Sequence, residues 1–354
     1  MAYTTIDDPS KYFQTALYTG DDGTSRAVTN DGNSDLQPDW IWIKDRGDTS
    51  APIVFDSTRG VNKKLRTDTA DSEETFAYLA SFNSDGFTIA TDDGAINADT
   101  SPYVAWQWNS NGGTRTTYAE SGNNPGGGFQ VNTTAGFSIV DWTGTGATGT
   151  AAHGLGAVPH IILVKCRNTA HDWAVYHHKN TAAPETDFLV LNDTSATADQ
   201  VQKWQDTAPT STNITFGDGG GVNANNQTHI AYVFTEIQGY SKFGSYIGNG
   251  NADGPFVYTG FSPAWVMVKR SDNTGSAHWM IKDSTRNPHN TVTDYLHANK
   301  TDAEGDDVLT DFLSNGFKQR SSNAINNANN SVFVYMAFAK SPFVSSKGIP
   351  TTAR

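Results

Sequence analysis

Short apolar runs recur along the chain, separated by segments rich in Asn, Asp, Ser, Thr and Gly. Three runs share one form, in which a lysine follows a proline by six positions: Pro38 and Lys44, Pro159 and Lys165, Pro263 and Lys269. Each run is apolar on both faces and rich in β-branched and aromatic residues, which predicts a strand covered on both sides. Proline is tolerated at the start of a strand because its missing N–H need not join the ladder.

Two further signatures accompany each run, which predicts an internal repeat. An aromatic-x-Gly turn precedes each proline, ending at Gly20, Gly144 and Gly248. A β-rich segment with a central alanine follows each lysine, at Ala105, Ala231 and Ala337. We expect the three lysines at the end of one equivalent strand and the three alanines in the middle of another.

The repeat predicts an all-β chain of three tandem, degenerate β-sandwich-like domains of about 100 residues, with short helical turns. The expected domains are 15–112, 137–240 and 243–340, which we call copies 1, 2 and 3. The remaining segments are an N-terminal docking segment (1–14), a Gly-rich linker that is flexible or runs over the surface (113–136), and a C-terminal tail (341–354). Copies 2 and 3 almost abut and are expected to pack together. The acidic stretches 71–79 and 303–309 are predicted to form the helical turns.

Charge and composition exclude several classes of binding partner and structural feature. The formal net charge of −13 disfavours nucleic acid and anionic membranes. The lone Cys166 excludes an intrachain disulfide. The N-terminus lacks a basic segment followed by an apolar run, and no apolar stretch approaches the ~20 residues of a membrane span. We therefore expect a soluble protein made in the cytoplasm.

Several patterns imitate catalytic or metal sites. Asp56 and Asp283 each begin an Asp-Ser-Thr-Arg motif, which could supply the two carboxylates of a glycosidase. A structural turn, in which Asp caps backbone N–H groups, is the favoured interpretation. No nucleophile elbow or phosphate loop is present, so we expect no enzyme activity and no cofactor.

Several histidines and one Asn-rich loop resemble metal-binding sequences. His177 and His178 are adjacent, with His171 and His153 near them in sequence, but neighbouring strand residues point to opposite faces and cannot chelate one ion. The loop that begins at Asn249 resembles a calcium loop, yet Gly260 stands where a bidentate Glu is required. The sequence therefore predicts no metal site and a hairpin turn at this loop.

The chain has nine Trp and 13 Tyr, which could serve as platforms for sugars. Those within the strand signatures are expected in the core or at interfaces: Trp40, Trp42, Trp106 and Trp265. Those outside the signatures are the candidates for ligand contact: Tyr118, Tyr176 and Trp204.

Four strings carry a family resemblance: 6–14, 31–44, 239–246 and 337–343. With them the chain resembles, over nearly its whole length, a repeated all-β domain of virion proteins of marine tailed bacteriophages, such as cyanophages and pelagiphages. The resemblance implies a place on the particle exterior, as a tail fibre, a tail-associated appendage or a head decoration. It implies assembly with other virion proteins, homo-oligomers and host attachment, and it transfers no catalytic residue. The alternative is a carbohydrate-binding module that recognises host surface glycans, and a glycan-degrading enzyme is the least favoured interpretation.

Overall fold

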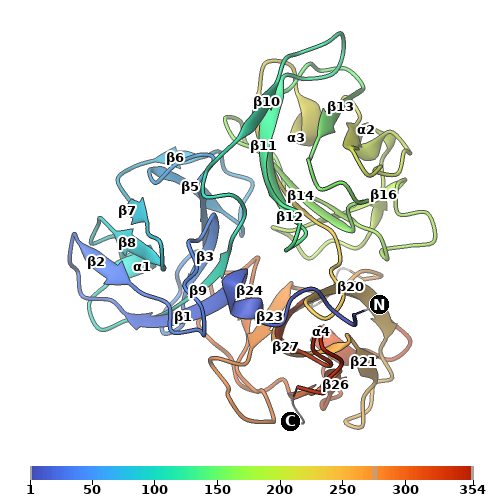
Figure 1. Cartoon of the computed structure of the whole chain (residues 1–354). Coiled ribbons are helices and arrows are strands. Elements are labelled where there is room, and N and C mark those ends of the chain that lie inside the picture. Colours follow the sequence, from blue (N-terminus) through green and yellow to red (C-terminus); the bar gives the residue numbers. More distant parts are fainter. Residues whose placement is uncertain (1, 274, 276, 352–354) are drawn as a thin grey trace.

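The computed structural model describes residues 2–273, 275 and 277–351, and its fold is all-β. Figure 1 shows three lobes around a common centre, one for each copy. Each lobe contains a large antiparallel sheet. The three large sheets have five strands in common, which follow the same spatial order in each sheet. Each lobe also has a small sheet that covers the outer face of its large sheet.

The strands of copy 1 form a six-stranded and a three-stranded sheet. In spatial order they are β1 (Phe13–Thr19), β9 (Pro102–Trp108), β3 (Trp40–Asp45), β4 (Ile53–Asp56), β5 (Lys63–Arg66) and β6 (Glu74–Thr75), then β2 (Arg26–Val28), β8 (Phe87–Ile89) and β7 (Leu79–Phe82).

Copy 2 has the longest sheet and the smallest partner sheet. Its strands are β10 (Thr116–Tyr118), β11 (Gly127–Asn132), β12 (Phe137–Thr143), β19 (Thr228–Phe234), β14 (Ile161–Cys166), β15 (Ala174–His177), β16 (Asp187–Val190) and β17 (Ala198–Asp199), then β13 (Gly149–Ala152) and β18 (Asn213–Phe216).

Copy 3 repeats the five central strands of the other large sheets. They are β20 (Ser241–Ile247), β27 (Val332–Pro342), β22 (Phe261–Arg270), β23 (Met280–Asp283) and β24 (Leu296–His297), with β21 (Phe256–Tyr258), β26 (Gly316–Gln319) and β25 (Thr310–Leu313) in the small sheet. The helices are single turns: η1 (Pro9–Lys11), α1 (Gly94–Asn97), α2 (Val201–Trp204), α3 (Gly220–Asn223) and α4 (Ala324–Asn327). Among the described residues no helix has the length and apolar character to cross a membrane.

The Pro-to-Lys strands β3, β14 and β22 are buried on both faces, as predicted. Along β3, Ile41 and Ile43 face the small sheet of copy 1, whereas Trp40 and Trp42 face the centre of the molecule. The inner faces of all three large sheets meet there in one shared core. Seven of the nine tryptophans lie in this core: Trp40, Trp42, Trp106, Trp108, Trp173, Trp265 and Trp279. The copies are therefore three sandwiches around a common centre.

Three backbone hydrogen bonds, one between each pair of copies, join the copies around this centre. The backbone N–H of Glu73 in copy 1 donates to Arg167 O in copy 2 at 2.6 Å. Thr197 in copy 2 donates to Ser271 O in copy 3 at 2.8 Å, and Glu304 in copy 3 donates to Arg46 O in copy 1 at 2.9 Å. Each copy thus binds the next, and the third closes the ring on the first.

The signature lysines reinforce the same ring. Lys44, Lys165 and Lys269 end β3, β14 and β22 on the shared-core side and have no exposed surface. Each ammonium donates to one carbonyl of its own copy and one of the neighbouring copy, namely Thr301 O, Ala70 O and Thr194 O at 3.0–3.1 Å. Burial lowers the pKa of each lysine to about 8.

The expected helical turns at 71–79 and 303–309 are wrong. The first stretch contains strand β6, and in the second Gly305 forms an isolated bridge with Tyr295. In these stretches the backbone N–H groups of Glu73 and Glu304 donate to carbonyls of the neighbouring copy instead of to carbonyls within a helical turn. The helical turns occur instead at α1 to α4.

The expected linker is only partly confirmed. Residues 113–124 run over the surface, and all of them except Tyr118 are exposed. The segment 113–136 is not a separate linker, however, because it includes β10 and β11, and β11 pairs along its whole length with β12. The Gln130 amide of β11 donates to Ser57 Oγ at 2.7 Å and Thr58 Oγ1 at 2.6 Å, and so binds copy 1.

The three signature alanines lie in the middle of the equivalent strands β9, β19 and β27, as predicted, but only two of them share the same register. Ala105 and Ala231 lie opposite Ile43 and Val164, one residue before the lysine. In copy 3 the residue opposite Val268 is Tyr335, and Ala337 lies two positions further on. Tyr335 fits because its other neighbour across the sheet is Gly244, where a Cβ would lie 2.6 Å from the tyrosine hydroxyl. Copy 1 has two alanines, Ala16 and Ala105, at the equivalent pair of positions. In copy 3 the larger tyrosine on one strand is therefore compensated by the smaller glycine on the next strand.

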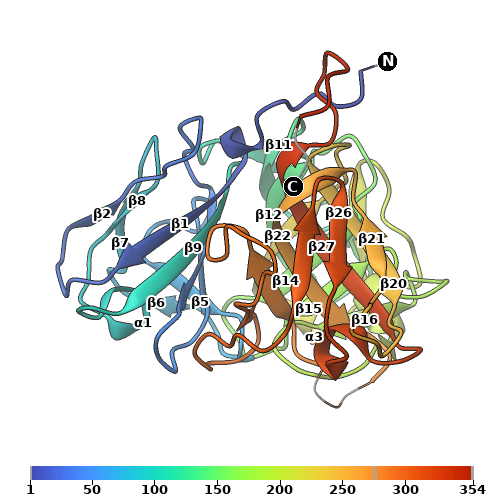
Figure 2. The same cartoon turned by 90° about the horizontal axis from the view of Figure 1, so that it is seen from below.

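Both terminal segments pack on the chain itself. Ile6 lies in the shared core, and the Tyr3 hydroxyl donates to Gly260 O at 2.7 Å. Asp7 accepts the backbone N–H of Ser346 at 2.6 Å, so that the N-terminal segment lies beside the C-terminal tail (Figure 2). Within the segments 1–14 and 341–354, Met1 and residues 352–354 lie outside the described residues.

Candidate functional site

One polar cluster lies at the seam between copies 2 and 3. His160 directly precedes β14, His178 directly follows β15, and Glu236 lies two residues after β19. Because β14 pairs with both β15 and β19, these strand ends meet at one edge of the sheet. The backbone fixes them there: His178 N donates to His160 O at 2.9 Å, and His160 N donates to Phe234 O at 2.7 Å.

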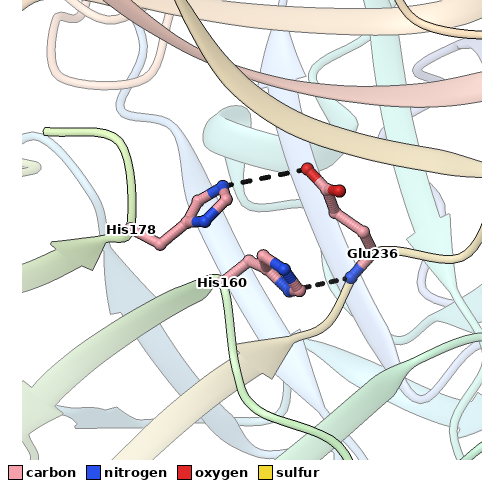
Figure 3. Close-up of side chains that lie close together, drawn as sticks. All are labelled: His160, His178 and Glu236. Carbon is pink, nitrogen blue, oxygen red and sulfur yellow. Dashed lines mark hydrogen bonds and ion pairs between the residues drawn. The ribbon is translucent and has the colours of Figure 1, made fainter. Parts of the chain in front are cut away.

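The three side chains point toward one another (Figure 3). The two imidazole rings are 4.4 Å apart and nearly perpendicular, and His178 Nε2 lies 3.8 Å from Glu236 Oε1. One ligand atom from each residue can be chosen so that all three lie within 4.8 Å of one another. All three side chains are partly exposed.

Copy 3 completes the surroundings of the cluster. Glu236 accepts the Lys242 ammonium at 2.7 Å and the Phe243 backbone N–H at 2.9 Å. His178 Nε2 donates to Phe243 O at 2.6 Å, and His160 Nδ1 accepts the Glu236 backbone N–H at 3.1 Å. Burial lowers the pKa of both histidines, to about 4 for His178, so both rings are neutral at neutral pH.

A groove opens beside the cluster. Its volume is about 380 Å³, and its lining is Tyr3, Glu236, Gln238, Ser241, Lys242, Tyr258, Thr259 and Gly260. The Tyr258 side chain is 54% exposed, and its hydroxyl lies 3.3 Å from that of Tyr3. Burial and the hydrogen bond with Tyr258 raise the pKa of Tyr3, so this phenol is neutral. The groove thus combines aromatic rings with a carboxylate, an amide, an ammonium and hydroxyls.

The candidates for ligand contact named from the sequence lie elsewhere, and two of them were placed wrongly. Trp204 and Tyr176 are buried in the core of copy 2, where their rings meet edge to face at 5.9 Å. Tyr118 is half-buried and packs against Phe129 of the same copy. Their distance from a strand signature suggested exposure, but Tyr176 and Trp204 fill the core of copy 2, and Tyr118 packs against that core.

The two Asp-Ser-Thr-Arg motifs are structural turns, not a carboxylate pair in a groove. Asp56 and Asp283 are fully buried, and each accepts the backbone N–H of the arginine three residues later at 2.8 Å. Each also binds that arginine's side chain. The Tyr232 hydroxyl donates to Asp56 at 2.7 Å, and the Trp106 indole donates to Asp283 at 2.9 Å, so each turn grips a neighbouring copy.

The remaining sequence candidates are structural as well. His177 is fully buried, burial lowers its pKa to about 3, and its Nε2 lies 3.1 Å from Tyr335 O of copy 3. His177 and His178 therefore have different partners, as their adjacency predicted. The loop that begins at Asn249 is not the expected hairpin turn, because it connects β20 of the large sheet to β21 of the small sheet. Asn327 holds this loop, and its amide donates to Asn251 O at 2.7 Å. Cys166 is buried beside Thr169.

Sequence reasoning missed His160 and Glu236. Their signal was positional: one residue stands just before a predicted strand and the other just after a second one, 76 residues later. It also missed an asparagine at the end of α1, α3 and α4, one in each copy. These residues, Asn97, Asn223 and Asn327, each accept a backbone N–H from the turn that follows the aromatic-x-Gly signature.

Comparisons with known proteins place the chain in a family. Neither a curated protein nor a solved structure matches it. One family model, described as "Domain of unknown function (DUF7483)", matches residues 8–342, which include all three copies. The chain therefore belongs to the DUF7483 family.

Proposed function

We propose that the chain is a structural component on the exterior of a tailed-bacteriophage particle, in a tail fibre, a tail-associated appendage or a head decoration. There it contacts other virion proteins and further copies of itself, and it contributes to host attachment. The resemblance of its repeat signatures to virion proteins suggests the location.

The observation that carries the proposal is the structural use of the repeated residues. The lysines and the Asp-Ser-Thr-Arg turns form hydrogen bonds with neighbouring copies, and the signature tryptophans fill the shared core. At Gly20, Gly144 and Gly248 a Cβ would lie 1.9–2.2 Å from a carbonyl oxygen of the short helix region. Repeated residues that all hold the three copies together are suited to a rigid component of a particle.

Labelling of purified particles with an antibody against this chain tests the proposal. We expect one label position, on the head or on the tail, and a matching signal in mass spectrometry of the particles. Presence of the chain in infected cells together with its absence from purified particles would refute the proposal. Release of reducing ends from a host polysaccharide by the purified chain would contradict a purely structural role.

A second candidate function is recognition of host surface glycans at the groove of Tyr3 and Tyr258. Sugars stack on aromatic faces and accept or donate hydrogen bonds with planar polar groups. The exposed ring of Tyr258 lies beside Glu236, Gln238 and Lys242 in this groove, which offers both kinds of contact. The groove combines Tyr3 of the N-terminal segment, the segment that joins copies 2 and 3, and the end of β21 with the two residues after it, so it occurs once per chain.

Strand β21 offers a matched control for this second function. Phe256 and Tyr258 are both exposed and project from the same face of β21, but only Tyr258 lines the groove. On an array of host surface glycans, Tyr258→Ala should abolish binding and Phe256→Ala should leave it intact. Equal losses in both variants, or no binding by the unaltered chain, would exclude the groove as a glycan site.

A further inference from the structure

Hydrogen bonds join His160, His178 and Glu236 to one another and to copy 3, but the other two seams have no histidine at these positions, so closing a seam does not require two imidazoles beside a carboxylate. Two imidazoles and a carboxylate are the donors that zinc and similar ions prefer, and catalytic zinc sites use three such protein ligands with a fourth position open. We propose that these three residues bind a divalent transition-metal ion, with Zn²⁺ as the best match, at the seam between copies 2 and 3. The proposal does not depend on where the protein acts.

Preorganisation supports the proposal. The three residues lie beside the ends of paired strands, and backbone hydrogen bonds join His160 to His178 and to Phe234. One ligand atom from each residue lies within 4.8 Å of the other two, so rotations of the side chains can bring the three atoms to one ion.

Hydrogen bonding and charge oppose the ion at two points. His178 Nε2 donates to Phe243 O at 2.6 Å, so this ring must bind the ion through Nδ1 or give up that hydrogen bond. The charged groups that act on the rings are Glu236, Lys179 and Lys242, with His177 next to His178. Lys242 opposes the ion, because its ammonium occupies Glu236 Oε2 at 2.7 Å. An ion must displace this ammonium or share the carboxylate with it.

The other two copies show what the seam contains without these ligands. At the equivalent positions copy 1 has Asp39, Ser57 and Ser110, and copy 3 has Ala264, Ser284 and Lys340. In copy 1 the Asp39 carboxylate accepts the Ser110 backbone N–H at 2.6 Å, the role that His160 Nδ1 has toward Glu236. A seam can therefore close without histidines, and the imidazoles of copy 2 add a ligand set that the other seams lack.

These equivalent residues supply substitutions that the fold already accommodates. His178→Ser introduces the residue of copies 1 and 3, His160→Ala that of copy 3, and Lys242→Gln that of copy 1, where Gln14 occupies the place. His289→Ala, an exposed histidine outside the seam, and His278→Ala, in a second histidine pair 4.9 Å from His297, control for unspecific binding.

The experiment is a calorimetric titration of the full chain with Zn²⁺ after treatment with a chelator. We expect one ion per chain, a loss of affinity of at least 10–100-fold in His160→Ala and His178→Ser, and unchanged affinity in both control variants. Lys242→Gln should bind Zn²⁺ more tightly, a gain that misfolding cannot produce. Three results would overturn the proposal. They are no binding of Zn²⁺ by the unaltered chain, an affinity of the His160→Ala and His178→Ser variants that equals that of the unaltered chain, and weaker binding by a folded Lys242→Gln variant.

Discussion

Glu73 is the residue through which the ring of contacts between copies 1 and 2 can best be tested. Its carboxylate accepts Arg167 Nε at 2.9 Å and Nη2 at 3.0 Å from copy 2, and Arg59 Nη1 at 3.2 Å from its own copy. Its side chain is 8% exposed and that of Arg59 is fully buried. Glu73→Gln keeps the shape but removes the charge that both guanidinium groups face.

The expected loss is about 3 kcal/mol in the free energy of unfolding. Removal of one partner from a buried ion pair costs about 3–5 kcal/mol. The lower end applies because Arg59 still binds Asp56 and Arg167 is 20% exposed. Copy 2 supplies the comparison, since Thr197 occupies the place of Glu73 and its Oγ1 donates to Asn180 Oδ1 of the same copy at 2.7 Å. Thr197→Val removes this neutral hydrogen bond and should cost about 1 kcal/mol.

Urea unfolding followed by tryptophan fluorescence measures both variants, because all nine tryptophans are buried. The acid limb gives an independent check. Burial raises the pKa of Glu73, but the hydrogen bond from Arg167 and the charge of Arg59 outweigh it and hold the pKa below its usual 4.5. The ionised form therefore stabilises the fold above pH 4.5, and this contribution is lost as the pH falls through the folded-state pKa.

Glu73→Gln should accordingly show a shallower fall of stability in acid than the unaltered chain. A loss no larger than that of Thr197→Val, together with an unchanged acid limb, would refute the idea that the ion network fastens copy 1 to copy 2.

Three other outcomes are expected. Gly144→Ala should lower the melting temperature because the new Cβ would lie 2.2 Å from Ala224 O, whereas Gly94→Ala, whose nearest neighbour is Ala98 Cβ at 3.9 Å, should not. Ala105→Leu should cost ~1–3 kcal/mol in urea unfolding, since Ala105 is fully buried between Ala16 and Ile43; a neutral result would show that the sheet can expand there. The free energy of unfolding should rise between pH 8 and 10, because the unfolded chain binds more protons than a fold in which Lys44, Lys165 and Lys269 have a pKa of about 8, against 10.5 ordinarily. A flat profile in urea titrations over that range would contradict it.

The strands could be predicted from the sequence because their signals are local. The six-residue step from Pro38 to Lys44 and its two counterparts span one strand each, and alternation assigns the two faces. Alternation does not say what each face meets. Ile41 and Trp42 are equally apolar, yet one packs within copy 1 and the other at the common centre, a difference that only the tertiary arrangement decides.

The register of the third alanine also depends on packing. Ala337 lies in the middle of β27, as predicted, but Tyr335 stands at the place of Ala105 because Gly244 of the neighbouring strand β20 leaves room for it. The spacing from α1, α3 and α4 carries this register, since Asn97, Asn223 and Asn327 precede Ala105, Ala231 and Tyr335 by eight positions each. His160 and Glu236 come together through the pairing of β14 with β19, which no local pattern encodes.

The closed ring of contacts among the copies has a consequence for how many sites one molecule presents. In a symmetric trimer of separate chains, every side chain at a seam would occur three times and could change only in triplicate. Covalent fusion of the copies lifts that restriction, so one seam holds imidazoles, another a carboxylate and serines, and the third Lys340 and Ser284. A particle built from this chain would therefore display one histidine seam per molecule, in a single orientation set by the two unlike neighbours.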